Sequence, residues 1–174
     1  RPVADRAGAP FRFLFVGRLL RDKGLVEYAE AARLLRPAWP HVDFAILGFT
    51  DSDNRTAVPM AEVRRWQDEK LMTYLGETSD VRPFIADSDC VVLPSYREGL
   101  PRSLLEAAAM GKPMIASDVP GCNDVVVDGE NGALYAPQGG LRISTRDLAR
   151  VGRMLLNGGT LDGVRIVSQR SVDL

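Results

Sequence analysis

The sequence predicts an α/β domain with a Rossmann-like, doubly wound parallel sheet. Short apolar runs alternate with segments of helical period in successive rounds between residues 11 and 127, which is the pattern of strand–helix units in a parallel sheet. The chain has 174 residues, of which 45% are hydrophobic and 26% charged, so it can build one well-formed core but not two large ones. Ligands of such sheets bind at the carboxyl ends of the strands, and we expect function in the loops at that edge.

The first round begins with an apolar, aromatic run at 11–16, which predicts a buried strand. A glycine-containing turn then leads to a helical pattern at 25–35, which Pro37 ends. The second round starts with a strand at 43–47, followed by a polar loop and a helix at 60–67.

The later rounds follow the same order. The remaining expected elements are a strand at 72–75, a short helix at 81–86, a strand at 90–94, a helix at 101–110, a strand at 113–117 and a short helix at 123–127. Pro101 suits the first helical position of the helix at 101–110, and Gly111 suits its stop. The last short helix is expected to end at the Asp-Gly-Glu-Asn-Gly string of 128–132.

The composition shifts near Pro137, so we expect a domain at 1–136 and a helical tail at 137–174. Paired glycines bracket a single amphipathic helix in this tail, with Ser144 or Thr145 as its cap.

The composition excludes several classes of function. The net charge is −1 and no sustained basic run occurs, which argues against a nucleic-acid partner and favours a small one. Cys90 lies in an apolar run and Cys122 in a turn, so we expect no disulfide framework and a cytosolic, reducing compartment. No apolar stretch approaches the roughly 18 to 20 residues that span a bilayer. The chain starts with neither an initiating Met nor a signal-peptide pattern, which suggests an excerpt from a longer protein.

Metal and nucleotide-loop motifs are missing. His41 is the only histidine, and it lies in what reads as a surface turn, so we give it no role. The two cysteines are not at ligand spacing, and a metal site is therefore not expected. Neither a Gly-x-Gly-x-x-Gly string nor a Walker-type loop occurs, which disfavours a dinucleotide dehydrogenase and a P-loop ATPase.

The loop at 17–24 joins the first strand to its helix. It combines Gly17 with the cations Arg18, Arg21 and Lys23, directly before a helix amino end. Such an end receives anions, so the loop could hold a diphosphate. The alternative, a solvated loop with incidental basic residues, stays open at this point.

Two carboxylates, Glu98 and Glu106, flank the start of the helix at 101–110. At about 1.5 Å of rise per residue they stand roughly 12 Å apart, too far to grip one glycosidic bond but suited to two parts of an elongated ligand such as a nucleotide sugar. The apolar neighbours of Glu106 predict a buried carboxylate, which a ribose diol would satisfy. Glu98 could instead have only a structural role, because a carboxylate just before a helix interacts favourably with the helix dipole. Gly99 allows close approach of the backbone, and the first helical N–H groups could face a phosphate or sugar oxygen.

Taken together, these features resemble the donor-binding half of retaining GT-B glycosyltransferases of family 4. The resemblance rests on Gly17-Arg18, Lys23-Gly24, the two glutamates around Gly-Leu-Pro, Pro120-Gly121 and the string 128–132, and it covers about residues 11–136. The strings 96–98 and 116–122 are most similar to the branch that builds capsule, O-antigen lipopolysaccharide or lipid-linked oligosaccharides. The chain departs from the family pattern at 122–124, where the acidic residue is Asp124 and often Glu in the family.

The resemblance implies a role for each site residue. Gly17, Arg18 and Lys23 would bind the donor diphosphate. Glu106 would bind the ribose hydroxyls, and Glu98 would act as the catalytic residue on the hydroxyls of the transferred sugar. The rest of the sugar and ribose site would comprise Gly99, Leu100, Pro101, Ser103 and Leu104. The donor would be a nucleotide-diphosphate sugar, with UDP expected, and fixed cations and helix amino ends would stabilise the departing diphosphate without a metal or other cofactor.

The resemblance also implies that half of an enzyme lies outside this chain. GT-B enzymes close two Rossmann-like domains over the donor, so a glycan or lipid-linked acceptor would need an amino-terminal domain. Membrane contact, at the cytoplasmic face, is expected only for the full-length protein. The chain alone should bind better than it catalyses, and a catalytically silent nucleotide-sugar-binding fragment remains an alternative.

Residues 137–174 resemble a segment of serine β-lactamase-like hydrolases. No Ser-x-x-Lys or Tyr-x-Asn string occurs, so the tail is not expected to supply hydrolase chemistry. Two interpretations remain open: a foreign reading frame fused near Pro137, or an ordinary helix after the last strand of the domain. A sugar epimerase is disfavoured because no tyrosine stands four residues before a lysine, and a glycoside hydrolase is disfavoured by the separation of the two glutamates.

Overall fold

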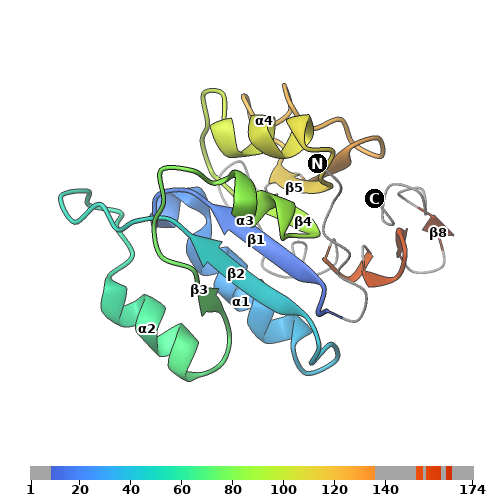
Figure 1. Ribbon diagram of the computed structural model, residues 1–174. Coiled ribbons are helices and arrows are strands. Elements are labelled where there is room, and N and C mark those ends of the chain that lie inside the picture. The colour runs from blue at the N-terminus through green and yellow to red at the C-terminus, as the bar shows by residue number, and fades with distance from the viewer. Residues whose placement is uncertain (1–8, 136–151, 155, 162–163, 166–174) are drawn as a thin grey trace.

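The computed structural model describes residues 9–135, 152–154, 156–161 and 164–165 (Figure 1). Its centre is a six-stranded, wholly parallel sheet in the order β3-β2-β1-β4-β5-β6. The strands are β1 (Arg12–Val16), β2 (Asp43–Leu47), β3 (Thr73–Tyr74), β4 (Cys90–Leu93), β5 (Met114–Ser117) and β6 (Gly132–Tyr135). The order reverses between β1 and β4, so the predicted doubly wound sheet is confirmed.

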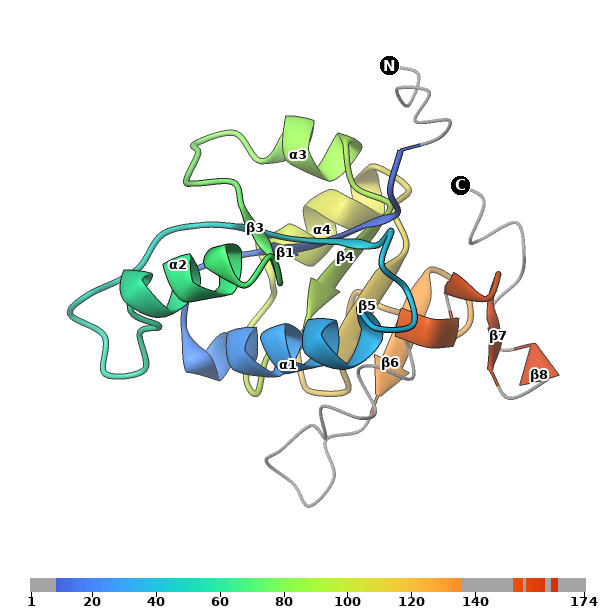
Figure 2. The same cartoon turned by 90° about the horizontal axis from the view of Figure 1, so that it is seen from below.

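Helices cover both faces of this sheet. They are a 3-10 turn η1 (Arg21–Lys23), α1 (Leu25–Leu35), α2 (Met60–Asp68), α3 (Arg82–Ala86) and α4 (Arg102–Ala109). Figure 2 shows α1 and α2 on one side of the sheet and α3 and α4 on the other. No helix of the described part of the chain is both long and apolar enough to cross a membrane.

The core fills the space between the sheet and its helices. Phe13 of β1 stacks on Phe44 of β2 with ring centroids 5.4 Å apart, and Tyr28 of α1 packs edge-on against Phe44. The buried Tyr28 hydroxyl donates a hydrogen bond to the Phe13 carbonyl, and burial raises the pKa of this phenol well above its usual value. Continuous apolar strands are what a sheet covered on both faces requires.

Two expected elements differ from the structure. The predicted helix at 123–127 is wrong, because residues 120–125 form turns there. The side chain of Asn131 accepts a hydrogen bond from Val127 N and donates one to Val125 O, while Asp128 accepts one from Leu134 N. These side-chain bonds compete with helical ones. Pro101 is also the N-cap of α4, in extended conformation, and not its first helical residue.

Strand β6 was not expected from the sequence. It begins at Gly132, where a Cβ would lie 2.3 Å from the Met114 carbonyl of the neighbouring strand, so only glycine permits the close approach. The string 128–132 is therefore a turn into a strand, and not the end of a helix.

Part of the tail belongs to the same core. Residues 152–154 and Leu156 are helical, Met154 is buried with the strand residues, and Gly152 lies against Leu35 of α1. A short antiparallel pair, β7 (Thr160–Leu161) and β8 (Val164–Arg165), follows. The expected caps Ser144 and Thr145 lie outside the described residues. The boundary at 136 stays a prediction.

Candidate functional site

A cavity of about 830 Å³ opens at the carboxyl ends of β1, β2 and β4. This volume lies within the range of small-molecule sites in proteins. Of the residues predicted for the site, Gly17, Arg18, Lys23, Glu98, Leu100, Pro101, Ser103 and Glu106 line it. Leu104 does not, because it is fully buried in the core, and Gly99 is not part of the lining.

Two loops that are far apart in sequence meet at this cavity. The backbone of Tyr96 and the hydroxyl of Ser95 both donate hydrogen bonds to the carbonyl of Asp22, at 2.9 and 3.1 Å. Gly24 has φ +72°, and a Cβ there would lie 1.9 Å from the Pro94 carbonyl. Glycine at this position therefore lets the loop after β1 lie directly on the loop after β4.

This contact joins Lys23 to Glu98. Lys23 Nζ donates a hydrogen bond of 2.6 Å to Glu98 Oε1, and the two side chains are 22% and 7% exposed. A carboxylate this buried requires a charged or hydrogen-bonding partner, and Lys23 provides it. The diphosphate role predicted for Lys23 and the sugar role predicted for Glu98 thus fall on two groups that bind each other in the structure.

The loop after β5 packs against the loop that carries Glu98. Gly121 has φ +86°, and a Cβ there would lie 1.9 Å from the Gly99 carbonyl. Its neighbour Cys122 is buried, and burial, reinforced by the Glu98 carboxylate, raises the pKa of the thiol to about 12. The loop after Ser117 is therefore packed against the loop that carries Glu98, and its residues are not part of the cavity lining.

Arg18 reaches the cavity from the same side as Lys23. Its guanidinium forms an ion pair of 3.0 Å with Asp51, and both side chains are partly exposed. Such a pair contributes little stability in water, so an anionic ligand can compete for Arg18. Arg18 and Lys23 thus give the cavity two cations, each held by a carboxylate, and Arg82 and Arg102 also line it.

The amino end of α4 forms the opposite wall. No side chain caps the amino end of α4, where Pro101 is the N-cap residue. The N–H groups of Leu104 and Leu105 both donate hydrogen bonds to the Pro101 carbonyl. The earlier N–H groups, those of Arg102 and Ser103, have no acceptor within the helix and are the ones open to an anion. Among the residues of α4, these two N–H groups are therefore the ones that a ligand anion could bind.

The prediction that Glu106 is buried is wrong. Its side chain is 34% exposed, because α4 buries only Leu104 and Ala107 and turns the face with Leu105 to solvent. A helix packed on one side of a sheet keeps a solvated face even when its residues are mostly apolar. Glu106 nevertheless lines the cavity, with the Arg102 guanidinium 3.9 Å away and Arg82 near enough to interact with its charge.

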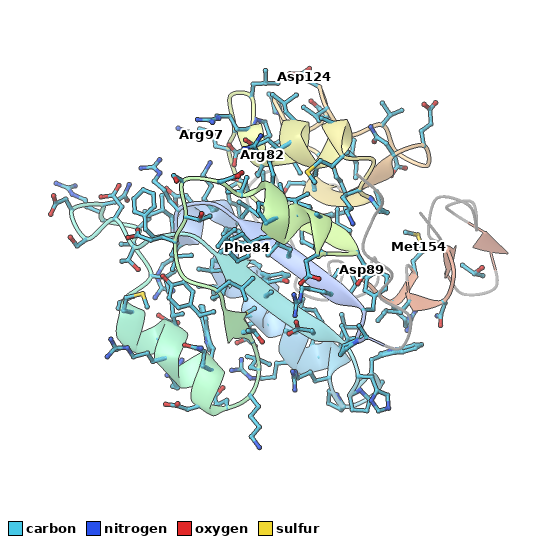
Figure 3. All side chains as sticks on the ribbon, in the orientation of Figure 1. Arg82, Phe84, Asp89, Arg97, Asp124 and Met154 are labelled. Carbon is cyan, nitrogen blue, oxygen red and sulfur yellow. The ribbon has the colours of Figure 1, made fainter. Side chains whose placement is uncertain are left out.

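Sequence reasoning missed the far end of the cavity. Phe49, 47% exposed, follows β2, and the segment from Glu77 to Arg82 follows β3. The Asp80 carboxylate pairs with the guanidinium of Arg82, which keeps the pKa of Asp80 low. Figure 3 shows Arg82 and Arg97 at the same end of the sheet, with Asp89 near the other end. Both loops directly follow predicted strands, at 43–47 and 72–75. Because ligands bind at the carboxyl ends of parallel strands, this position alone could have pointed to them.

The lining of the cavity combines cations, the N–H groups at the amino end of α4, the Glu106 carboxylate and the exposed ring of Phe49. An elongated anion with a hydroxylated and an aromatic part matches these groups. Among the described residues, no group of three or more His, Cys, Asp or Glu side chains could hold a metal ion. The expectation that no metal is needed stays a prediction.

The family model described as "Glycosyl transferases group 1" matches residues 10–154. Among curated proteins, the N,N'-diacetylbacillosaminyl-diphospho-undecaprenol alpha-1,3-N-acetylgalactosaminyltransferase of Campylobacter jejuni is 33% identical over 119 residues, which cover 68% of this chain and 30% of that protein. The chain thus spans about a third of that relative.

Solved structures give the same fold. The C-terminal domain of a glycosyl transferase group 1 family protein, LpcC from Francisella tularensis, superposes with a TM-score of 0.74 at 22% identity, covering 98% of this chain and 88% of that one. The Anabaena protein HepE in complex with UDP superposes with a TM-score of 0.73 at 23% identity, covering 94% of this chain and 42% of HepE. The family match crosses the predicted boundary at 136, and these matches give the β-lactamase resemblance of the tail no support.

Proposed function

Because this chain belongs to the group 1 glycosyl transferases, we propose that it is the donor-binding half of a retaining glycosyltransferase. The full-length protein would move a sugar from a nucleotide diphosphate, UDP, to a glycan or lipid-linked acceptor. One observation carries the proposal: a single cavity collects Arg18, the Lys23–Glu98 pair, the open amino end of α4 and Glu106.

The donor diphosphate binds at Arg18, Lys23 and the N–H groups of Arg102 and Ser103. Charge-assisted hydrogen bonds from these groups stabilise the negative charge that grows on the departing nucleoside diphosphate. When Lys23 turns to the phosphate, Glu98 loses its partner. Its carboxylate then accepts hydrogen bonds from the hydroxyls of the transferred sugar, which restores the pairing that its burial demands.

The rest of the nucleotide lies along the cavity toward the missed loops. Glu106 accepts hydrogen bonds from the ribose hydroxyls, and Phe49 with the segment 77–82 holds the base. UDP is the nucleotide we propose, because the structurally similar HepE is described in complex with UDP. An aromatic ring beside a planar base stabilises binding by stacking.

The chain by itself is proposed to bind the donor without transferring sugar. It spans 30% of the Campylobacter relative, and transfer requires a second domain that positions the acceptor and excludes water. That relative is named for an undecaprenyl-diphosphate-linked acceptor, which supports a lipid-linked acceptor here. The buried free thiols Cys90 and Cys122 are compatible with action in the cytoplasm, at the inner face of the membrane.

A calorimetric titration of UDP into the 174-residue chain tests this function. We expect saturable binding that is lost in Glu106→Ala and in the double variant Arg18→Ala/Lys23→Ala, with weaker binding of ADP and GDP. The matched control is Arg33→Ala, which removes an exposed arginine from the end of α1, away from the cavity. Absence of UDP binding by a folded wild type, or equal binding by all variants, overturns the assignment.

A further inference from the structure

Tyr96 lies two positions before Glu98 in the loop after β4, and its hydroxyl donates a hydrogen bond to Glu27 Oε1. The backbone N–H of Tyr96 also donates a hydrogen bond of 2.9 Å to the Asp22 carbonyl. Both acceptors belong to the segment that carries Lys23, because Asp22 directly precedes Lys23 and Glu27 lies in the first turn of α1. The loop with Glu98 is therefore attached to this segment both before and after Lys23.

The hydroxyl of Ser95 adds a third attachment to the same loop. It is wholly buried and lies 3.1 Å from the carbonyl of Asp22 and 3.1 Å from that of Arg97. A serine hydroxyl has a single proton to donate, so the two carbonyls share it. This hydroxyl thus connects the segment that carries Lys23 to the residue directly before Glu98.

The Glu27 carboxylate is incompletely paired for its position. Its Oε1 accepts the hydrogen bond from Tyr96, while Oε2 is buried and has no hydrogen-bond partner among the described residues. A buried carboxylate oxygen without a partner lowers stability. Two apolar side chains of similar shape could fill positions 27 and 96 without this cost, so packing alone does not account for the pair.

The Tyr96–Glu27 pair lies beside the donor cavity and not in it. Glu27 and Tyr96 line a neighbouring cavity of about 640 Å³ together with Lys23. Lys23 also lines the donor cavity, whereas Glu27 and Tyr96 are not part of that lining. The pair is therefore close enough to affect Lys23 and Glu98 but does not line the cavity in which the donor is proposed to bind.

We propose that Tyr96 is a positioning residue of the donor site, which through its bond to Glu27 holds the Glu98 carboxylate in place for the transferred sugar. This inference rests on the proposed transferase function. In the structure, the ion pair with Lys23 also holds Glu98. When Lys23 turns to the diphosphate, that pair is lost, and the position of Glu98 then depends on the attachments of its loop. Tyr96 thus acts on the binding of the sugar and not of the nucleotide, as residues that support a binding group commonly do.

A calorimetric comparison of UDP with UDP-sugars tests this role in the 174-residue chain. The probes are UDP-glucose, UDP-galactose and their two N-acetylamino counterparts, and the one that the wild type binds most tightly is used. We expect Tyr96→Phe to lower the preference for the UDP-sugar over UDP about fivefold, without weakening UDP binding, because Glu98 is held less firmly. Glu27→Ala should act in the same way. Glu27→Gln keeps an oxygen for the Tyr96 hydroxyl and should retain the wild-type preference.

Tyr28→Phe is the matched control for loss of a tyrosine hydroxyl. Its hydroxyl donates a buried hydrogen bond to the Phe13 carbonyl in the core, away from the donor cavity. This variant should lower stability and leave the preference for the UDP-sugar unchanged. If Tyr96→Phe does not fold, Glu27→Ala and Glu27→Gln give the same comparison.

Urea unfolding tests the positioning without any ligand. A double-mutant cycle of Lys23→Met and Glu98→Gln measures the coupling free energy of the ion pair. We expect this coupling to decrease when the cycle is repeated in Tyr96→Phe, and to stay the same in Tyr28→Phe. A purely structural role of Tyr96 would lower overall stability in both backgrounds but leave the coupling unchanged.

An unchanged preference in Tyr96→Phe, UDP binding weakened as much as that of the UDP-sugar, or an unchanged coupling each overturns the proposal. A wild type that binds UDP but prefers no UDP-sugar removes the sugar role of Glu98, and the proposal falls with it. If a folded wild type binds none of these ligands, the proposed donor function falls, and the urea cycle still decides whether Tyr96 positions Glu98 against Lys23.

Discussion

Lys23 and Glu98 lie 75 positions apart in the sequence and form an ion pair of 2.6 Å in the candidate donor site. Glu98 is almost fully buried, so solvent screens this pair less than a surface pair. If Lys23 binds the donor diphosphate as proposed, a ligand phosphate and Glu98 compete for the same ammonium group. The Lys23–Glu98 pair would then oppose the binding of a diphosphate that brings no sugar to Glu98.

Glu98→Gln should tighten the binding of UDP about fivefold, because it frees Lys23 from an interaction of roughly 1 kcal/mol. The same variant should lose any preference for a UDP-sugar over UDP. Calorimetry of both ligands measures this. Glu62→Gln, which removes the carboxylate partner of Arg21 outside the donor cavity, is the control and should leave UDP binding unchanged. Weaker UDP binding by Glu98→Gln would contradict the competition.

Gly24→Ala should unfold at markedly lower urea concentration than the wild type. The left-handed backbone costs about 1–2 kcal/mol with a Cβ, and the clash with the Pro94 carbonyl adds about 1–3 kcal/mol. Gly111→Ala is the matched control, because Gly111 has φ +66° with no heavy atom within 4 Å of a Cβ. It should show the conformational cost alone. Equal losses in the two variants would mean that the contact with Pro94 is not tight.

Phe49→Ala should weaken UDP binding, because base–aromatic stacking contributes about 1–3 kcal/mol. The expected effect is an increase in Kd of about 5- to 150-fold, read by calorimetry. Leu34→Ala removes another large exposed apolar side chain, on α1, and should leave the Kd unchanged. If Phe49→Ala also binds like the wild type, the base lies elsewhere in the cavity.

The stability of the chain should fall at alkaline pH, in part through Cys122. Burial raises the pKa of this thiol from 9.0 to about 12, so the folded state keeps the proton longer than the unfolded state. Its contribution is complete below pH 9.0 and is lost as pH rises toward about 12. Urea unfolding across this window measures it. Cys122→Ala should give a shallower decline than the wild type, and an identical slope would show that Cys122 does not contribute.

Most of the fold followed from local pattern. The apolar runs of β1, β2, β4 and β5 and the helical period of α1 are properties of adjacent residues, so the sequence displays them directly. The segment 123–127 shows the limit of this approach. Its composition permits a helix, but the side chains of Asp128 and Asn131 bond to the backbone and hold turns instead.

The candidate site was only partly visible. Arg18, Lys23, Glu98 and Glu106 all line one cavity, and the donor roles predicted for them stay predictions. The pairing of Lys23 with Glu98 depends on contact between distant loops, which no local pattern encodes. The exposure of Glu106 depends on which face of α4 meets the sheet, and the loop at 77–82 carries no motif of its own.

Two glycines, Gly24 and Gly121, let the loops around the cavity lie backbone against backbone. Gly24 rests on Pro94 and Gly121 rests on Gly99, so backbone contacts fix the outline of the cavity. Phe49 and residues 77–82 line the same cavity but take no part in these contacts between glycine and backbone. If these residues hold the base as proposed, substitutions there change which nucleotide binds and leave the backbone contacts that shape the cavity in place, so one fold can serve many different donors.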